Sequence, residues 1–148
     1  EAAAERAAAM FPQVAEYCPA GVKLTEGGLE DVRHGAEAWH CDIRINPDWP
    51  SYGRGGICVL MVHEYGHLAG LPHVDDPASY MNPTPHPETV PACALIQQHE
   101  ERLGRVADAI WTLRENRPYG SKAQRRNIDR KIRRLKGVRY RLQVILGP

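Results

Sequence analysis

Alternating apolar and polar positions predict a small β-sheet in the first third of the chain. Within residues 38–45, every odd-numbered position is apolar, which is the period of a half-buried strand. Two shorter segments, residues 22–24 and 29–33, predict further strands. The Gly27-Gly28 and His34-Gly35 steps predict turns beside them. We therefore expect a twisted, three-stranded sheet.

Helices are predicted on both sides of this sheet region. Residues 1–16 are rich in alanine and other strong helix formers, so an opening helix is expected. Residues 46–56 contain two prolines and three glycines, which predict a loop leading into a helix over residues 57–69. The apolar face of that helix is expected to pack against the sheet. Residues 72–93 contain six prolines and are expected to be irregular.

The last third of the chain predicts two long helices. Apolar residues recur at three- and four-residue steps over residues 94–113 and again over residues 128–145. Ser121 and Gln124 form a capping-box pattern that starts the second helix, and Gly137 predicts a kink or an early end within it. The short connection predicts an antiparallel helical hairpin. The expected fold class is therefore α+β.

Length and hydropathy are those of one domain without a membrane span. The chain has 148 residues, enough to bury a single core. Its longest apolar run, residues 57–62, is too short to cross a bilayer. The chain begins with Glu1 rather than Met, so we expect a processed or truncated product whose signal or pro-segment lies outside this sequence.

Four cysteines predict two disulfides and hence an oxidising compartment. They are Cys18, Cys41, Cys58 and Cys93, and no two of them form a Cys-x-x-Cys pair. The sequence leaves three connectivities open. We favour Cys41–Cys58 with Cys18–Cys93, because the first bridge would pin a strand end to the start of the helix over residues 57–69. Four buried thiols in a cytosolic protein are the alternative.

The segment HEYGHLAGLPH carries the main chemical signal. His63 and His67 lie four residues apart, so both rings can reach one ion from the same face of a helix, with Glu64 offset beside them. Gly70 can adopt a left-handed conformation that ends the helix and lets His73 act as a third ligand. Three protein ligands leave a fourth position open, as in a catalytic zinc site. A surface histidine pair on a helix is the alternative interpretation.

This segment and the turn SYMNP that follows it resemble the metzincin metallopeptidases, most closely matrixin-like enzymes and small bacterial members. The resemblance is specific over residues 57–83. It implies a zincin-like fold and peptide-bond hydrolysis by a zinc-bound water that Glu64 activates as general base. It also implies that Met81 forms the hydrophobic floor of the site. The implied ligands of the single catalytic Zn²⁺ are His63, His67 and His73.

The chain is small for a metzincin, so its substrate-binding loops are expected to be minimal and its cleft shallow and open. Residue 83 is Pro, where some metzincins carry a Tyr that ligates zinc or steadies the oxyanion, so zinc itself is expected to supply most of that stabilisation. A related zincin group uses Asp as the third ligand, but His73 stands at the right offset here, so Asp75 and Asp76 are expected to shape the turn. The candidate substrate-pocket residues are Asn82, Pro83, Thr84, His86 and Ile43.

The sequence thus predicts a secreted, monomeric zinc endopeptidase that acts on a peptide or protein. Residues 1–93 are expected to form the catalytic core, with the zinc site at 57–83. Residues 94–148 are expected to form a basic helical hairpin, packed on or appended to that core within the same domain. An extended substrate is expected to pair with the strand over residues 38–45.

Charge is distributed unevenly along the chain. Residues 1–100 hold 5 basic and 14 acidic residues, whereas residues 101–148 hold 14 basic and 4 acidic. A solvated helix face that offsets the acidic part is the simplest interpretation, and an anionic partner surface bound through residues 121–141 is a second. Among these basic residues only Tyr140 could stack on a base, which argues against nucleic acid as the partner. The alternative function is therefore a zinc-bearing docking module whose hairpin attaches to an anionic surface.

Overall fold

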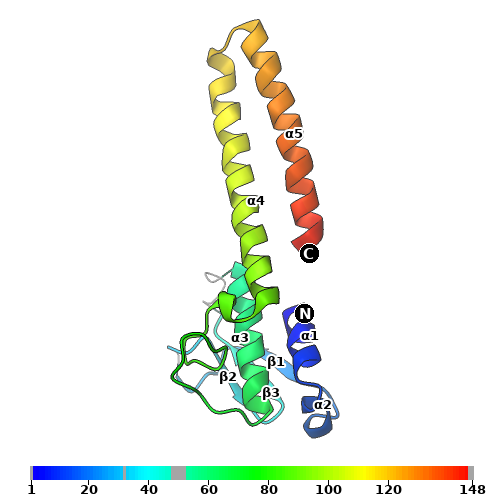
Figure 1. The fold of residues 1–148 in the computed structure, drawn as a ribbon, viewed down its shortest axis with the longest axis vertical. Coiled ribbons are helices and arrows are strands. Elements are labelled where there is room, and N and C mark those ends of the chain that lie inside the picture. Colours follow the sequence, from blue (N-terminus) through cyan, green and yellow to red (C-terminus); the bar gives the residue numbers. More distant parts are fainter. Residues whose placement is uncertain (1, 32, 48–52, 147–148) are drawn as a thin grey trace. The chain divides into compact units, whose positions relative to one another are not determined.

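The computed structural model describes residues 2–31, 33–47 and 53–146, which confirm the predicted α+β class (Figure 1). These residues fall into two compact units, Glu1–Gln97 and Gln98–Pro148. The described elements are, in chain order, α1 (Ala2–Met10), α2 (Val14–Tyr17), β1 (Lys23–Glu26), β2 (Ala36–Trp39), β3 (Asp42–Ile45), α3 (Gly53–Leu68), the 3-10 turn η2 (Pro87–Thr89), α4 (Pro91–Asn116), the 3-10 turn η3 (Arg117–Tyr119) and α5 (Lys122–Leu146).

The sheet has the order β1-β3-β2, with β1 parallel and β2 antiparallel to the central strand β3. The single strand predicted over residues 38–45 is wrong, because the chain turns at His40, whose φ is +52°. The inward-facing positions change phase across this turn, since Ala38 pairs with Ile43. Trp39 is consequently 61% exposed, whereas Ile43 is completely buried.

The strand predicted over residues 29–33 is also wrong for its described residues, and Val32 lies outside them. The Glu37 carboxylate accepts hydrogen bonds from the backbone N–H groups of Glu30 (2.8 Å) and Asp31 (2.9 Å). These donors are therefore satisfied by a side chain instead of a neighbouring strand. The Glu37 carboxylate thus takes the place of the strand-to-strand hydrogen bonds that the apolar pattern predicted.

Helix α3 begins at Gly53, earlier than the predicted residue 57, so the last part of the loop predicted over residues 46–56 is wrong. Residues 48–52 of that loop lie outside the described residues. Gly55 gives the reason, because a Cβ there would lie 2.6 Å from the Cβ of Gln97 and 3.2 Å from the carbonyl oxygen of Cys93. Glycine here allows close helix packing and does not mark a turn.

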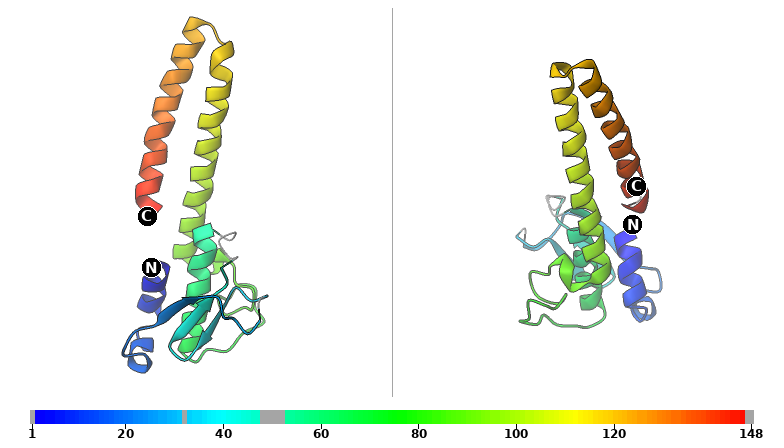
Figure 2. Two further views of the ribbon diagram at one scale, coloured as in Figure 1. Left: turned by 180° about the vertical axis from the view of Figure 1, so that it is seen from behind. Right: turned by 45° about the horizontal axis from the view of Figure 1, so that its top comes forward.

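The core of the first unit forms where α1, the sheet and α3 meet. Figure 2 shows the three strands lying against α3, and α1 packs on the same helix. Because α3 is covered by these neighbours, its side chains are held in fixed positions. The buried α3 residues in this core are Cys58, Val59, Leu60, Met61, Val62 and Tyr65.

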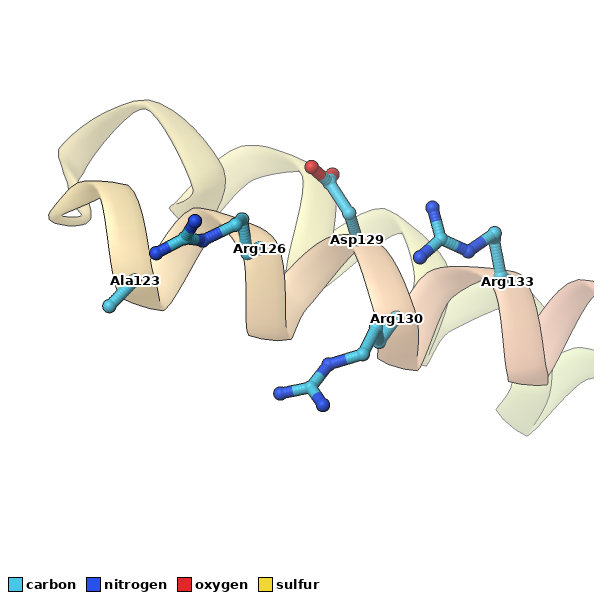
Figure 3. A pocket seen from close by; sticks show the side chains of 5 residues that line it. All are labelled: Ala123, Arg126, Asp129, Arg130 and Arg133. Carbon is cyan, nitrogen blue, oxygen red and sulfur yellow. The ribbon is translucent and has the colours of Figure 1, made fainter.

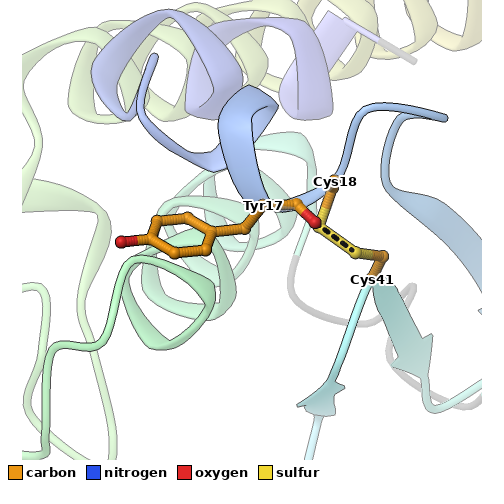
Figure 4. Close-up of a disulfide and its surroundings, with 3 residues drawn as sticks. All are labelled: Tyr17, Cys18 and Cys41. Carbon is orange, nitrogen blue, oxygen red and sulfur yellow. Dashed lines mark hydrogen bonds between the residues drawn. A yellow bond between two sulfur atoms is a disulfide. The ribbon is translucent and has the colours of Figure 1, made fainter.

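Two disulfides brace this unit, which confirms that the four cysteines are paired. The bridges are Cys18–Cys41 and Cys58–Cys93, so the pairing of Cys41 with Cys58 was wrong. Cys41 lies at the β2–β3 turn, 3.6 Å from the carbonyl oxygen of Tyr17 at the end of α2 (Figure 4). Cys58 of α3 is instead bonded to Cys93, which lies in the first turn of α4. The strand end and α3 are therefore each fastened to a different helix.

The second unit is an antiparallel hairpin of α4 and α5. Its small core consists of Val106, Ile110, Ile132 and Leu142. Ser121 and Gln124 form the predicted capping box, with Gln124 Oε1 accepting from the Ser121 N–H at 2.7 Å. The early end that was one of the two outcomes predicted at Gly137 is wrong, since α5 continues through this residue. One glycine lowers helix stability by only about 1 kcal/mol relative to alanine, which a long helix can tolerate.

None of the described helices is both long enough and apolar enough to span a bilayer.

Candidate metal centre and adjacent cavity

Three imidazoles converge at the C-terminal end of α3. His63 and His67 lie on the same face of the helix, and His73 returns to them from the segment that follows. The Nε2 atom of His67 is 3.0 Å from the Nε2 atoms of both His63 and His73, and the latter two are 3.1 Å apart. Three nitrogens at these separations can serve as ligands of one ion.

Backbone carbonyls orient two of the three rings. The Nδ1 atom of His63 lies 2.7 Å from the carbonyl oxygen of Tyr80, and that of His67 lies 2.9 Å from the carbonyl oxygen of Leu71. A carbonyl can only accept, so each Nδ1 carries the proton and each neutral ring directs the lone pair of its Nε2 inward. Converging lone pairs repel one another unless a cation lies between them. The donor set therefore fits a metal such as Zn²⁺.

Burial favours the neutral form of His63 and His73. Burial is the main reason that the pKa of His63 is lowered to about 4; the neighbouring rings of His67 and His73 act in the same direction, and the hydrogen bond to Tyr80 acts against them. Burial also lowers the pKa of His73, with smaller effects from His67 and His34. Neutral imidazole is the form that binds metal. The site is thus prepared for a cation at neutral pH.

A left-handed residue brings the third histidine into place. Gly70 has a φ of +84°, and Leu71 N–H donates to the carbonyl of Gly66 at 2.9 Å as α3 ends. The returning segment is then fixed by the Val74 N–H, which donates to the carbonyl of Met81 at 3.1 Å. His73 is therefore held between the helix end and the methionine turn.

The methionine turn passes directly below α3. Met81 is 4% exposed, and its Sδ occupies the space that a Cβ on Gly66 would need. The turn is held by the Ser79 Oγ, which accepts from the Met81 N–H at 3.0 Å. Asp76 accepts from the Ala78 N–H at 2.9 Å and so shapes the turn, as expected of it. Neither Asp75 nor Asp76 belongs to the metal-binding group, which was identified within the described residues.

Glu64 is a buried carboxyl group beside the three histidines. It is 3% exposed, and burial raises its pKa to about 7, with a smaller contribution from the charge of Glu37. A hydrogen bond from the Ala38 backbone acts in the opposite direction. A carboxyl with a pKa near neutrality can both accept and donate a proton. A bound cation would shift this pKa downward and favour the base form.

A cavity of about 650 Å³ opens beside Glu64. This volume is within the range of small-molecule and side-chain pockets, about 300–1,000 Å³. It is larger than the shallow cleft expected. Three candidate pocket residues, Pro83, Thr84 and His86, line it together with Val59 and Leu60 of α3.

The remaining two pocket candidates lie elsewhere. Ile43 is completely buried in the core and is not among the residues that line this cavity. Asn82 is not among the lining residues, and its Oδ1 accepts from the N–H and the hydroxyl of Thr84, both at 3.0 Å. Asn82 therefore holds Thr84, which lines the cavity, in position.

The sequence did not reveal several residues that shape the site. Backbone carbonyls such as those of Tyr80 and Leu71 have no sequence signature, because every residue carries one. Gly66 had a signal, since a glycine inside a strongly apolar helix marks a close approach. Ala38 could have been found only from the strand pairing.

Comparison with known proteins supports part of this description. The chain is 32% identical over 109 residues to matrix metallopeptidase-21 from Danio rerio, an alignment that covers 64% of this chain and 18% of that protein. The chain therefore spans less than a fifth of the length of this relative. No protein-family profile matches the chain, and no solved structure matches it. A distant matrixin homology and a three-histidine group together suggest zinc-dependent protease activity.

Proposed function

We propose that the protein is a zinc-dependent endopeptidase of the metzincin type, similar to the matrixins. The convergence of the Nε2 atoms of His63, His67 and His73 within 3.1 Å of one another carries this proposal. The distant similarity to a matrix metallopeptidase supports the same class. Zincin-like topology and residues 1–93 as the catalytic core belong to this proposal.

The chain's own residues supply the remaining chemistry. His63, His67 and His73 would hold Zn²⁺, which, when bound, polarises the scissile carbonyl and makes water more acidic. Glu64 accepts a proton from the attacking water, and the same carboxyl later returns it to the leaving amine. Its burial beside the cavity keeps bulk water from competing for that proton. Met81 supports the ligands from below.

An extended peptide would pair with β2 and not with β3. Both edges of β3 are occupied, by β1 on one side and β2 on the other. In β2, Glu37 and Trp39 lie opposite Arg44 and Asp42, and Gly35 accepts from the Asn46 N–H. Hydrogen-bonded pairs alternate along an antiparallel ladder, so the backbone groups of Ala36 and Ala38 point to the open edge. The bond from Ala38 to Glu64 places that edge beside the proposed base.

The cavity would receive the substrate side chain next to the scissile bond. Val59, Leu60 and Pro83 contribute apolar side chains to its lining. An apolar side chain that enters this pocket leaves water, and its burial makes binding more favourable. We propose that the enzyme prefers a large apolar residue at this subsite.

Extracytoplasmic action is part of the same proposal. Two disulfides, the matrixin-like relative and the lack of a spanning helix in the described residues are compatible with an extracellular protein. We propose that the protein is secreted and acts as a monomer on peptides or proteins.

Metal removal and return test the proposed function. The full chain, incubated with an unfolded protein, should produce cleavage products that a strong chelator abolishes and one equivalent of Zn²⁺ restores. His73→Ala should lower zinc affinity and activity together. Activity that survives complete removal of the metal would refute the proposal.

A further inference from the structure

Most of the positive charge of the hairpin lies on helix α5. Between Lys122 and Leu146 it holds ten Lys and Arg and a single acidic residue, Asp129. The part of α4 in the second unit, residues 98–116, has three basic and four acidic residues and is nearly neutral. The basic residues of α5 are exposed. This charge is therefore concentrated on one helix and is not spread evenly over the unit.

Three arginines of α5 lie along one shallow groove. Arg126, Arg130 and Arg133 line it together with Ala123 and Asp129, and the groove has a volume of about 520 Å³ (Figure 3). Figure 3 shows their guanidinium groups projecting away from the helix backbone. Their spacing of four and three residues places them on the same side of the helix.

The one carboxylate in the groove does not neutralise these arginines. Asp129 is bound by Arg117 through two hydrogen bonds, of 2.8 Å and 3.1 Å. This pairing, more than the charge of Arg133, lowers the pKa of Asp129 and keeps it ionised. Within the part of the chain that the structure describes, Arg126, Arg130 and Arg133 have no ion-pair partner of their own. Three unpaired guanidinium groups side by side favour an anionic ligand.

The same side of α5 continues into exposed apolar side chains. Five residues on this side, at steps of four, three, seven and four residues, form what we term the outward stripe: Arg126, Arg130, Arg133, Tyr140 and Val144. Tyr140 is 69% exposed and Val144 is 63% exposed. The stripe is about 27 Å long at 1.5 Å per residue. It therefore combines phosphate-binding groups with residues that gain from leaving water.

We propose that the outward stripe of α5 docks the protein on a bilayer that contains anionic phospholipid. Arginine forks match phosphate oxygens, and Tyr140 is suited to the headgroup level of a membrane. Val144 can enter the acyl boundary, whereas it has no π-face on which a nucleic-acid base could stack. The two disulfides of the other unit also indicate an oxidising compartment, where membrane surfaces are available and nucleic acid is scarce. The proposal does not depend on the zinc site.

Vesicle binding tests this docking surface. The full chain should co-sediment with phosphatidylcholine vesicles that contain one-third phosphatidylglycerol, and not with pure phosphatidylcholine vesicles. Binding should weaken steeply with added salt, because surface charges are screened. The triple variant Arg126→Gln, Arg130→Gln and Arg133→Gln should bind about a hundredfold more weakly, from roughly fivefold per charge near an anionic surface.

A matched control separates the stripe from net charge. Arg102, Arg105 and Arg114 of α4 are also exposed, and replacing all three by Gln removes the same charge. This control should lose much less binding than the stripe variant. The double variant Tyr140→Ser and Val144→Ser should weaken vesicle binding while leaving the salt dependence unchanged. Circular dichroism should show that all three variants keep their helix content.

Three results would overturn the proposal. Equal losses in the stripe variant and the α4 control would show that only overall charge matters. Tighter binding to a DNA duplex than to the anionic vesicles, lost in the stripe variant, would assign the surface to nucleic acid. Salt-sensitive self-association without vesicle binding would assign it to the acidic unit of a second copy.

Discussion

The sulfur of Met81 lies where a Cβ on Gly66 would stand. Gly66 lies in α3 between His63 and His67, so the methionine turn approaches the helix directly below the two helical ligands. Packing at this point fixes the height of the turn. The same turn contains Tyr80, whose carbonyl oxygen orients the His63 ring.

Gly66→Ala should therefore disturb both stability and metal binding. Overpacking at this contact should lower the free energy of unfolding by about 1–3 kcal/mol, despite the better helix propensity of alanine. Zinc affinity should fall by about tenfold, since the groups that orient the ligands would move. Urea unfolding of the metal-free protein and competition with a chromogenic chelator measure the two effects.

Gly104→Ala is the matched control for this substitution. Gly104 is also helical, but no heavy atom lies within 4 Å of the position of its Cβ. Alanine there should raise stability by up to about 1 kcal/mol and leave zinc affinity unchanged. If the two substitutions behaved alike, the packing of Met81 under Gly66 would not be the cause.

Two buried groups should give the metal-free protein opposing pH dependences. The pKa of His63 is lowered to about 4, so between that value and its usual 6.5 the unfolded state binds more protons and stability falls as pH falls. The pKa of Glu64 is raised to about 7 from its usual 4.5, so in that window the folded state binds more protons and stability falls as pH rises.

Single substitutions should separate the two contributions. Relative to the wild type, Glu64→Gln should make stability fall more steeply as pH drops from about 6.5 to about 4. His63→Gln should make stability fall more steeply as pH rises from about 4.5 to about 7. Thermal unfolding in the presence of chelator across this range measures both. Parallel pH profiles for the two variants would contradict the assigned environments.

The disulfide connectivity should be directly observable. Proteolysis without reduction, followed by mass spectrometry, should yield peptides linked through Cys18–Cys41 and through Cys58–Cys93. The bridges span 23 and 35 residues. Removing either pair by alanine substitution should lower stability by about 3–4 kcal/mol in the chain-entropy description. A peptide that links Cys41 to Cys58 would contradict the fold of the first unit.

The sequence could predict features that depend on local spacing. His63 and His67 share a helix face because they are four residues apart in the sequence. Gly70 ends that helix in a left-handed backbone conformation, which glycine adopts readily. The capping box at Ser121 is equally local. In each case the interacting groups lie within a few residues of one another, so the pattern itself contains the geometry.

Features that depend on distant partners could not be predicted in this way. The alternation through Trp39 looked like one strand, but the turn after Trp39 changes the phase of the inward-facing positions, so that Ala38 and Ile43 share a face and Trp39 is exposed. Gly55 resembled a loop residue because its partner, Gln97, lies far along the sequence. The choice among three disulfide connectivities likewise depends on tertiary packing.

The most direct measurement of the proposed function compares wild type and Glu64→Gln, each loaded with one equivalent of Zn²⁺, in cleavage of an unfolded protein. Both should retain the metal, because the three imidazoles are unchanged, as measured by elemental analysis after gel filtration. Turnover by Glu64→Gln should fall by at least about a hundredfold, since the general base is lost. Equal turnover by the two zinc-loaded proteins would contradict the assignment of Glu64 as the base of a zinc endopeptidase.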